Sequence, residues 1–477
     1  MAGKYLVHTF GCQMNAHDSD RMSEVLEARG WLVAEDAEQA DLIVLNTCSV
    51  REKAEQKLRS EIGKLAPLKK RHPELVLAVA GCVAQQEGEA LLGRVPHLDL
   101  VIGPDNLAEL PDLVREQQAG SPPRARTVFD LSSPRFLPAS PRPGRAPVSA
   151  WVTTMKGCDE RCSFCIVPYT RGPERYRPHE DILRDIARFV ASGAREITLL
   201  GQTVDSYRDP ALPPPAALDP DESQFPELLR IIARQVPELA RLRYTSPHPR
   251  HLTPSLVRAH AELPVLARHV HMPVQSGSDR VLRRMIRRYT RAEYVRRVES
   301  LREACPDLTL TTDIIVGFPG ETREDFEATL DLVREVGFVG LFGFKYSPRP
   351  YTPALKLGDD VPEAEKSERL ARLFEVSEAI TQAHLGRLVG TTQRVLVEGA
   401  SKDAARAQGR TARNEIVHVL VPPGHDATGA LLDVEITQAF KHSLAGEPAP
   451  GQLAAMPARA QQPAPARRTR RSLPLAP

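Results

Sequence analysis

The stretch Gly157-Cys-Asp-Glu-Arg-Cys-Ser-Phe-Cys-Ile-Val-Pro-Tyr-Thr-Arg-Gly172 carries three cysteines, Cys158, Cys162 and Cys165. A structural zinc site takes four protein ligands, whereas a 4Fe-4S cluster held by three cysteines keeps one iron open for a small molecule. Half of a zinc knuckle is the alternative, but no nearby Cys or His completes a ligand set at zinc-finger spacing. The spacing therefore favours an iron–sulfur cluster with an open iron.

Length, charge and cysteine count narrow the class of protein. The chain has 477 residues, a formal net charge of +2 and seven cysteines. An odd cysteine count without a signal-like N-terminus predicts a cytoplasmic protein without a disulfide framework. Because no apolar run reaches the length of a membrane span, we expect no membrane partner. A nearly neutral chain can bind nucleic acid only through local basic patches.

Residues 1–120 alternate strand-like and helix-like segments. The strand candidates are Lys4–Phe10, Asp41–Asn46, Leu75–Ala80 and Leu98–Ile102. The helical patterns include Ser19–Ala28, Ser49–Leu65 and Ala84–Leu92. This alternation predicts an α/β domain with a parallel, doubly wound sheet.

A second set of cysteines follows successive strands of this predicted sheet. Cys12 follows the first strand, Cys48 the second and Cys82 the third. Loops at the carboxyl ends of parallel strands converge on one crevice, so these thiols are expected to meet there. Such a meeting suits a second cluster with an open iron, while three unrelated buried thiols are the alternative.

Residues 121–147 are rich in proline and arginine and are predicted to be a linker without regular structure. The arginines suit either a basic strap for RNA or a merely solvated connection. After residue 446 the composition changes again, and residues 447–477 are predicted to be a disordered tail rich in Pro, Ala and Arg.

Residues 148–378 contain strand candidates separated by helical segments. The strands are Ala150–Lys156, Glu196–Gly201, Leu242–Ser246, His269–Val274, Leu308–Val316 and Leu341–Tyr346. The helices include Glu180–Ser192, Pro226–Ala240, Asp279–Ala304 and Arg323–Val336. The pattern predicts a partial (β/α)6 barrel with its site at the carboxyl ends of the strands, where the three-cysteine loop follows the first strand. Residues 209–223 are proline-rich and are predicted to be a surface insertion.

Residues 380–446 change to short β-type runs, which predict a small β-barrel. The runs are Gln393–Glu398, Glu415–Val421 and Leu431–Thr437, broken by Gly and Pro turns. Barrels of this kind bind nucleic acid through basic and loop surfaces. Candidate RNA-binding residues are therefore Arg394, Arg410, Arg413 and Lys441. The competing basic feature is the arginine-rich segment 280–288, which is equally compatible with the solvated outer face of a barrel helix.

These motifs, taken in order over residues 4–446, resemble the methylthiotransferase family of the radical S-adenosylmethionine (SAM) enzymes. The resemblance lies in Thr9–Asn15, Asn46–Glu52, Gly81–Gln85, the stretch Gly157–Gly172 and the barrel motifs Pro273–Ser278 and Asp313–Glu321. The last region resembles the TRAM RNA-binding module through Val395–Gly399, Gly409–Thr411 and Val434–Thr437.

Within that family, Gln13-Met14-Asn15, Arg51-Glu52-Lys53 and Pro168–Gly172 resemble the forms of the subgroup acting on N(6)-dimethylallyladenosine at position 37 of tRNAs. Sister enzymes that modify threonylcarbamoyladenosine in tRNA or a ribosomal-protein aspartate are the alternative. A non-catalytic iron–sulfur protein that binds RNA or transfers electrons is a further one. Tyr351 departs from the pattern, which has Gly in Ser-Pro-Arg-Pro-Gly-Thr-Pro and thus puts the local turn in question.

The resemblance implies two 4Fe-4S clusters, two uses of SAM and addition of a methylthio group to carbon 2 of the adenine. Cys158, Cys162 and Cys165 would hold the cluster that binds SAM, and Cys12, Cys48 and Cys82 the sulfur-carrying cluster. The SAM contacts are placed by resemblance at Gly201, Gln202, Gln275, Ser276, Ser278 and Gly317. Thr322 and Asp325 also suit a helix cap beside that last glycine. The implied partners are tRNA and a flavodoxin- or ferredoxin-type electron donor, with the enzyme acting as a monomer.

Overall fold

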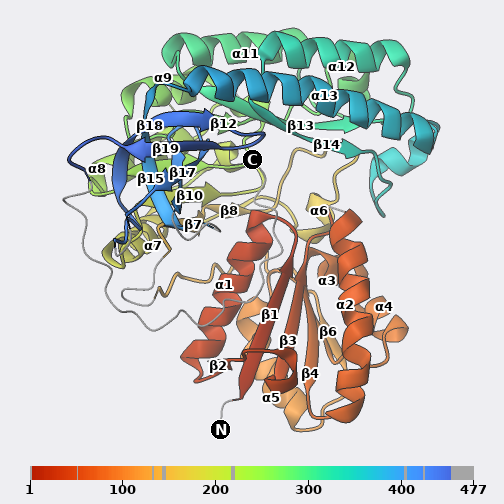
Figure 1. The fold of residues 1–477 in the computed structure, drawn as a ribbon. Coiled ribbons are helices and arrows are strands. Elements are labelled where there is room, and N and C mark those ends of the chain that lie inside the picture. Colours follow the sequence, from red (N-terminus) through yellow and green to blue (C-terminus); the bar gives the residue numbers. More distant parts are fainter. Residues whose placement is uncertain are drawn as a thin grey trace.

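The computed structural model describes residues 3–50, 52–131, 134–141, 147–215, 221–401, 406–422 and 425–452. Figure 1 shows an N-terminal α/β domain below, a central domain of strands and helices above it, and a small β-barrel at the side of the central domain. The predicted fold class is confirmed in all three parts. The predicted disordered tail 447–477 is wrong for residues 447–452, because strand β19 (Leu444–Pro448) reaches into this segment and Gln452 accepts from the Asp433 backbone. Residues 453–477 lie outside the described residues, as do residues 132–133 and 142–146 of the predicted linker and 216–220 of the predicted insertion.

The N-terminal domain is built on a parallel sheet with the strand order β2-β1-β3-β4-β5-β6. The strands are β1 (Lys4–Phe10), β2 (Leu32–Val33), β3 (Leu42–Thr47), β4 (Val76–Gly81), β5 (Leu100–Ile102) and β6 (Arg124–Arg126). All residues of β3 and β4 are buried, as expected for strands covered on both faces. The order reverses at β1, so the crevice between the ends of β1 and β3 is the position where such sheets bind ligands.

Helices cover both faces of this sheet. They are α1 (Gln13–Ala28), α2 (Glu52–Arg71), α3 (Cys82–Glu87), α4 (Glu89–Arg94) and α5 (Leu110–Gln118). Leu58 and Ile62 of α2 pack with Leu45 on one face, and Met22 and Leu26 of α1 pack with other strand residues on the opposite face. The single helix expected over Ala84–Leu92 is wrong, because Gly88 at φ +50° separates α3 from α4.

Part of the predicted linker belongs to this domain. Arg124–Arg126 pairs with Leu100–Ile102 as strand β6, so the prediction of no regular structure is wrong for these residues. Their backbone extends an existing parallel ladder, which prolines on either side do not interrupt.

The central domain is a curved set of parallel strands. They are β7 (Ser149–Thr153), β10 (Glu196–Leu200), β11 (Arg241–Tyr244), β12 (His269–His271), β13 (Thr309–Val316) and β14 (Gly340–Lys345). They form two three-stranded sheets, linked by a parallel bridge between Leu242 and Leu266. The predicted partial barrel is confirmed, with every predicted strand present. The short strands β8 (Met155–Lys156) and β9 (Arg175–Tyr176) pair at the base of the three-cysteine loop.

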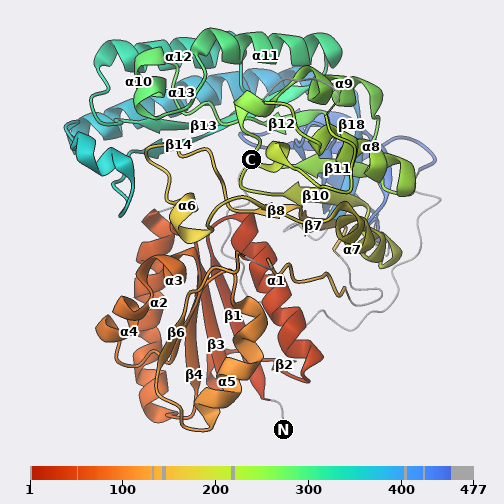
Figure 2. The ribbon, with the colours of Figure 1, turned by 180° about the vertical axis from the view of Figure 1, so that it is seen from behind.

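Helices flank these strands on the outside (Figure 2). They are α7 (His179–Ala191), α8 (Phe225–Gln235), α9 (Pro254–Glu262), α10 (Asp279–Arg284), α11 (Arg291–Ala304) and α12 (Arg323–Val336). The predicted cap of α12 is confirmed, since Thr322 and Asp325 form a capping box. The continuous helix expected over Asp279–Ala304 is wrong, because Ile286 and Arg288 have positive φ and break it.

One long helix, α13 (Glu363–Leu388), runs along the central domain and leads into the C-terminal barrel. The predicted domain boundary at 378–380 therefore falls inside a helix. The barrel is closed in the order β15-β16-β17-β19-β18 within its described residues. Its strands are β15 (Thr392–Ala400), β16 (Arg406–Thr411), β17 (Ile416–Leu420), β18 (Leu431–Ala439) and β19 (Leu444–Pro448). No helix in the described ranges is long and apolar enough to cross a membrane.

Candidate active site

The three-cysteine loop lies at the carboxyl end of the first barrel strand, between β8 and the short helix α6 (Val167–Thr170). The Cys158 Sγ lies 2.9 Å from the Thr203 Oγ1, just beyond β10. The Arg287 guanidinium donates to the Cys162 Sγ at 3.3 Å and to the Pro273 carbonyl at 2.9 Å. Neighbouring strands thus hold the loop from several sides.

Burial controls the protonation of these thiols. It raises the pKa of Cys158, and it raises the pKa of Cys165 to about 12 with help from Cys162. Cys158 and Cys165 are therefore protonated at neutral pH until a metal displaces the proton. The Arg287 guanidinium beside Cys162 is placed to offset the negative charge of a thiolate-bound cluster.

The second trio gathers at the carboxyl edge of the N-terminal sheet. Cys12 precedes α1, Cys48 follows β3 and Cys82 opens α3. A hydrogen bond with Cys12, followed by burial, raises the pKa of Cys48 well above its usual value, so these two thiols touch. Gly11 has φ +142°, and a side chain there would collide with Cys48, so only glycine allows this approach.

An amide network fixes these loops. The Asn15 Nδ2 donates to the Asn46 Oδ1 at 3.1 Å, and the Asn46 Nδ2 donates to the Ser19 Oγ at 2.9 Å. All three side chains are buried. In the sequence, these three residues lie within or beside the first two cysteine motifs, Asn15 as the end of the run Gln13-Met14-Asn15.

At the domain boundary, α6, which follows the three-cysteine loop, lies above the carboxyl edge of the N-terminal sheet (Figures 1 and 2). Arg171, directly after α6, donates to the Cys82 Sγ at 3.4 Å and to the Asp18 carboxylate at 2.6 Å. Only 3% of Arg171 is exposed. Burial opposes the charge of Asp18, but Arg171 and His17 hold its pKa down at about 2. The sequence motif contains Arg171 but gave no sign of this role.

Each donor set consists of three thiols, the ligand type that holds iron–sulfur clusters. Among the described residues, no three Cys, His, Asp or Glu side chains gather around one point as a mononuclear site requires. A 4Fe-4S cube attaches each cysteine to a different iron, which spaces the ligands apart. The thiols of each trio are close enough to interact with one another, and their role as cluster ligands stays a prediction.

Three of the predicted SAM-contacting residues border the three-cysteine loop or the barrel strands. The Gln202 Oε1 accepts from the Gly157 backbone at 2.5 Å, and the Gln202 Nε2 is buried without a partner among the described residues. A buried unpaired donor beside the loop fits a polar ligand such as SAM. Gln275 is buried at φ +74° next to β13. Gly201 packs against Met155 and Val204.

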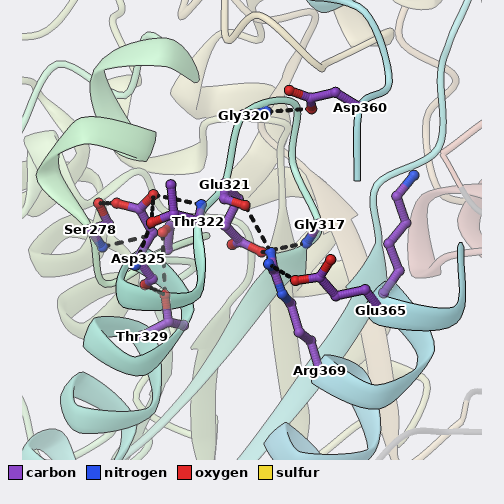
Figure 3. A network of polar contacts seen from close by, with 12 residues as sticks. Ser278, Gly317, Gly320, Glu321, Thr322, Asp325, Thr329, Asp360, Glu365 and Arg369 are labelled. Carbon is purple, nitrogen blue, oxygen red and sulfur yellow. Dashed lines mark hydrogen bonds and ion pairs between the residues drawn. The ribbon is translucent and has the colours of Figure 1, made fainter. Parts of the chain in front are cut away.

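The other three candidates are occupied by protein contacts (Figure 3). The Ser278 Oγ donates to Asp325 at 2.6 Å, and the Ser276 Oγ lies 3.3 Å from the Thr329 Oγ1. The Gly317 backbone N–H donates to Glu321 at 2.6 Å, and Glu321 pairs with Arg369 of α13. Ser276 and Ser278 thus contact α12, and their contact with SAM stays a prediction.

The predicted RNA-binding residues differ in their exposure to solvent. The carbonyls of Arg410 and Thr411 accept from Arg241 and Arg243, at the amino end of β11, and only 8% of Arg410 is exposed. Arg413 pairs with Glu415 at 2.9 Å. These contacts fasten the small barrel to the central domain, on the side away from the cysteine loops. Arg394 and Lys441 are exposed, with Lys441 paired to Glu378 at 2.8 Å, and RNA binding by all four residues stays a prediction.

Comparison with known proteins places this geometry in a family. Three family models match in succession, "Uncharacterized protein family UPF0004" on residues 4–103, "Radical SAM superfamily" on 152–333 and "TRAM domain" on 386–449. A tRNA-2-methylthio-N(6)-dimethylallyladenosine synthase of Sorangium cellulosum is 62% identical, over 99% of this chain and 98% of its own length. The same-named protein of Chromobacterium violaceum is 47% identical, over 93% and 98%.

The structure of TsrM from Kitasatospora setae, a radical SAM methyltransferase, superposes with a TM-score of 0.52 at 16% identity, covering 84% of this chain and 81% of that one. At that identity the likeness concerns the fold alone. Together, the cysteine loop at the end of a partial barrel and the family matches define a radical SAM methylthiotransferase, a class that uses a 4Fe-4S cluster and SAM. At 62% identity over nearly its full length, the chain belongs to the family of tRNA-2-methylthio-N(6)-dimethylallyladenosine synthases.

Proposed function

We propose that this chain adds a methylthio group to carbon 2 of N(6)-dimethylallyladenosine at position 37 of tRNAs, using two clusters held by two cysteine trios. The observation that carries the proposal is the contact between Arg171, which follows the three-cysteine loop, and Cys82 of the other trio. One substrate base placed between the trios would lie within reach of both.

Each of the two cysteine trios would hold a cluster with a different task. When bound, the cluster and SAM supply the one-electron chemistry that activates an unreactive C–H bond, and the second cluster supplies sulfur. The protein residues position and shield these groups. Arg287 and Arg171 place positive charge at Cys162 and Cys82, and Gln202 offers a buried amide donor beside Cys158.

Closure of the site against water depends on the domain boundary. The Arg349 guanidinium, beyond β14, pairs with Glu55 of α2 at 2.7 Å and donates to the Val50 carbonyl at 3.1 Å. Lys156 reaches Asp105 at 3.1 Å from the opposite side. These ion pairs hold the N-terminal sheet over the barrel mouth, which excludes side reactions of a radical.

The remaining features of the proposal concern partners. A flavodoxin- or ferredoxin-type donor in the cytoplasm supplies electrons, and the enzyme acts as a monomer. The barrel contributes tRNA affinity through exposed cations such as Arg394 and Lys441, since phosphate contacts dominate such affinity.

The test is anaerobic reaction of the reconstituted chain with tRNA containing N(6)-dimethylallyladenosine, followed by mass spectrometry of the nucleosides. Parallel reactions contain tRNA with threonylcarbamoyladenosine or ribosomal protein. A methylthio product only in the first reaction supports the proposal. Product only in one of the others assigns the chain to a sister activity.

A further inference from the structure

Two exposed tyrosines stand beside each other near the cysteine loops. Tyr169 lies on α6, four residues beyond Cys165, and Tyr351 lies beyond β14. Their ring centroids are 5.9 Å apart and the planes are tilted by 35°. Tyr169 is 42% exposed and Tyr351 64% exposed. The rings therefore pack on each other while offering faces to solvent.

The backbone of Tyr351 is strained. Its φ is +68°, in the left-handed region that favours glycine, and the family pattern has glycine here. The turn alone would be better served by glycine, so the bulky ring needs another explanation. Strained residues that persist on a surface point toward a functional role.

The turn that carries Tyr351 is fixed to both cysteine loops. Arg349 binds the carbonyl of Val50, two residues beyond Cys48. The Ala354 N–H donates to the carbonyl of Ser163, inside the three-cysteine loop, at 2.8 Å. Figures 1 and 2 both show this segment descending from β14 toward the end of α2, beside α6.

The surroundings of the pair are apolar and bear a cation. The exposed large apolar side chains on these anchoring loops are Val50, Leu355 and Leu357. Lys356, on the same short turn, is exposed. An aromatic face beside a cation is the arrangement by which proteins hold single-stranded nucleic acid, with a base on the ring and a phosphate near the charge.

We infer that Tyr169 and Tyr351 form a stacking platform for an unpaired base of the tRNA anticodon loop, next to the adenosine that enters the site. The inference rests on the proposed function, which requires a single-stranded RNA loop to bind beside the cysteine loops. Tyr351 supplies the larger exposed face, and Tyr169 supports it from α6. Stacking accepts any base, so the platform sets the position of the loop without reading sequence.

The experiment uses the reconstituted full-length enzyme without reductant and an anticodon stem-loop RNA containing N(6)-dimethylallyladenosine. The RNA carries 2-aminopurine at a nucleotide flanking that adenosine, because its fluorescence falls on stacking. We expect quenching with the unchanged enzyme. Tyr351→Gly should lose the quenching and bind the RNA about fivefold more weakly. Tyr351→Phe should keep both, since its ring remains.

Tyr351→Gly is a favourable variant because it relieves the positive φ, so its thermal unfolding temperature should not fall. Equal quenching and affinity in Tyr351→Gly and the unchanged enzyme, at both flanking positions, would overturn the platform. If methylthiolated product still forms in that case, in a parallel reaction that contains SAM and reductant, the proposed function survives alone. Slower reduction by flavodoxin with unchanged RNA affinity would also overturn it, and would assign the surface to the electron donor. Absence of any RNA binding or product would overturn both.

Discussion

Arg171 is the residue whose replacement tests the domain boundary most strictly. Its guanidinium is buried, contacts Asp18 and Cys82, and leaves the Arg171 Nη1 without a partner among the described residues. Arg171→Met keeps much of the side-chain volume but strands the Asp18 carboxylate in the interior. Removing one member of a buried ion pair costs about 3–5 kcal/mol.

The pKa shift of Asp18 gives an independent value for the stabilisation of its charged form. Its pKa falls from 3.8 to about 2 against the effect of burial, which corresponds to about 2 kcal/mol in favour of the charged form. We therefore expect Arg171→Met to lower the free energy of unfolding of the metal-free chain by about 3 kcal/mol. The double variant with Asp18→Asn should recover at least about 1 kcal/mol, because no charge is then left unpaired.

Urea unfolding of the metal-free protein at neutral pH, followed by circular dichroism, measures both values. Asp18→Asn alone completes the cycle, and Arg184→Met, an exposed arginine paired on α7, is the matched control. A change below about 0.5 kcal/mol for Arg171→Met, similar to the control, would refute the reasoning. It would mean that water or a shifted backbone satisfies Asp18 at the boundary.

The remaining predictions concern metal, pH and RNA. Replacing Cys158, Cys162 and Cys165 together with Ala should lower iron after reconstitution from about eight to about four per chain, and unchanged iron would contradict the assignment. Burial lowers the pKa of His251, but its hydrogen bonds to Glu160 and to the Asp221 carbonyl and the charges of Asp205 and Glu160 together outweigh burial and raise it to about 9. The stability that protonated His251 contributes is fully present below pH 6.5 and is lost as pH rises through 9. Melting temperatures measured from about pH 6 to about pH 10 should therefore fall less steeply for His251→Gln than for the unchanged chain. Arg394→Ala with Lys441→Ala should reduce the salt dependence of tRNA binding by about one unit of slope for each phosphate that is no longer neutralised. Arg410→Ala should instead destabilise the barrel, and an equal slope change in both variants would restore Arg410 as an RNA contact.

Sequence patterns predicted best where one local rule decides the structure. The largely apolar runs at Leu42–Thr47 and Val76–Gly81 are typical of buried parallel strands, and their order along the chain placed the cysteines on one edge of the sheet. The capping pair Thr322 and Asp325 likewise predicted the start of α12, because a capping box is a local sequence signal.

The errors arise where tertiary contacts override local preference. Ile286 and Arg288 adopt positive φ although neither is Gly or Asn, so nothing local marked the break between α10 and α11. That break turns Arg287 inward onto Cys162, whereas the charge pattern alone was equally compatible with a surface for RNA and with a solvated helix face. The burial of Arg410 was likewise not visible in the sequence, because it depends on the contact between the barrel and β11.

The central claim is that the two cysteine trios perform separate tasks at one site. The most direct measurement is to quantify 5′-deoxyadenosine and the methylthiolated nucleoside in the same anaerobic reaction, for the unchanged enzyme and for Cys12→Ala. The account predicts that Cys12→Ala still forms 5′-deoxyadenosine but yields no methylthiolated nucleoside, since Cys158, Cys162 and Cys165 lie in the other domain. Loss of both products while the cluster at Cys158, Cys162 and Cys165 stays intact, or retention of both, would contradict it.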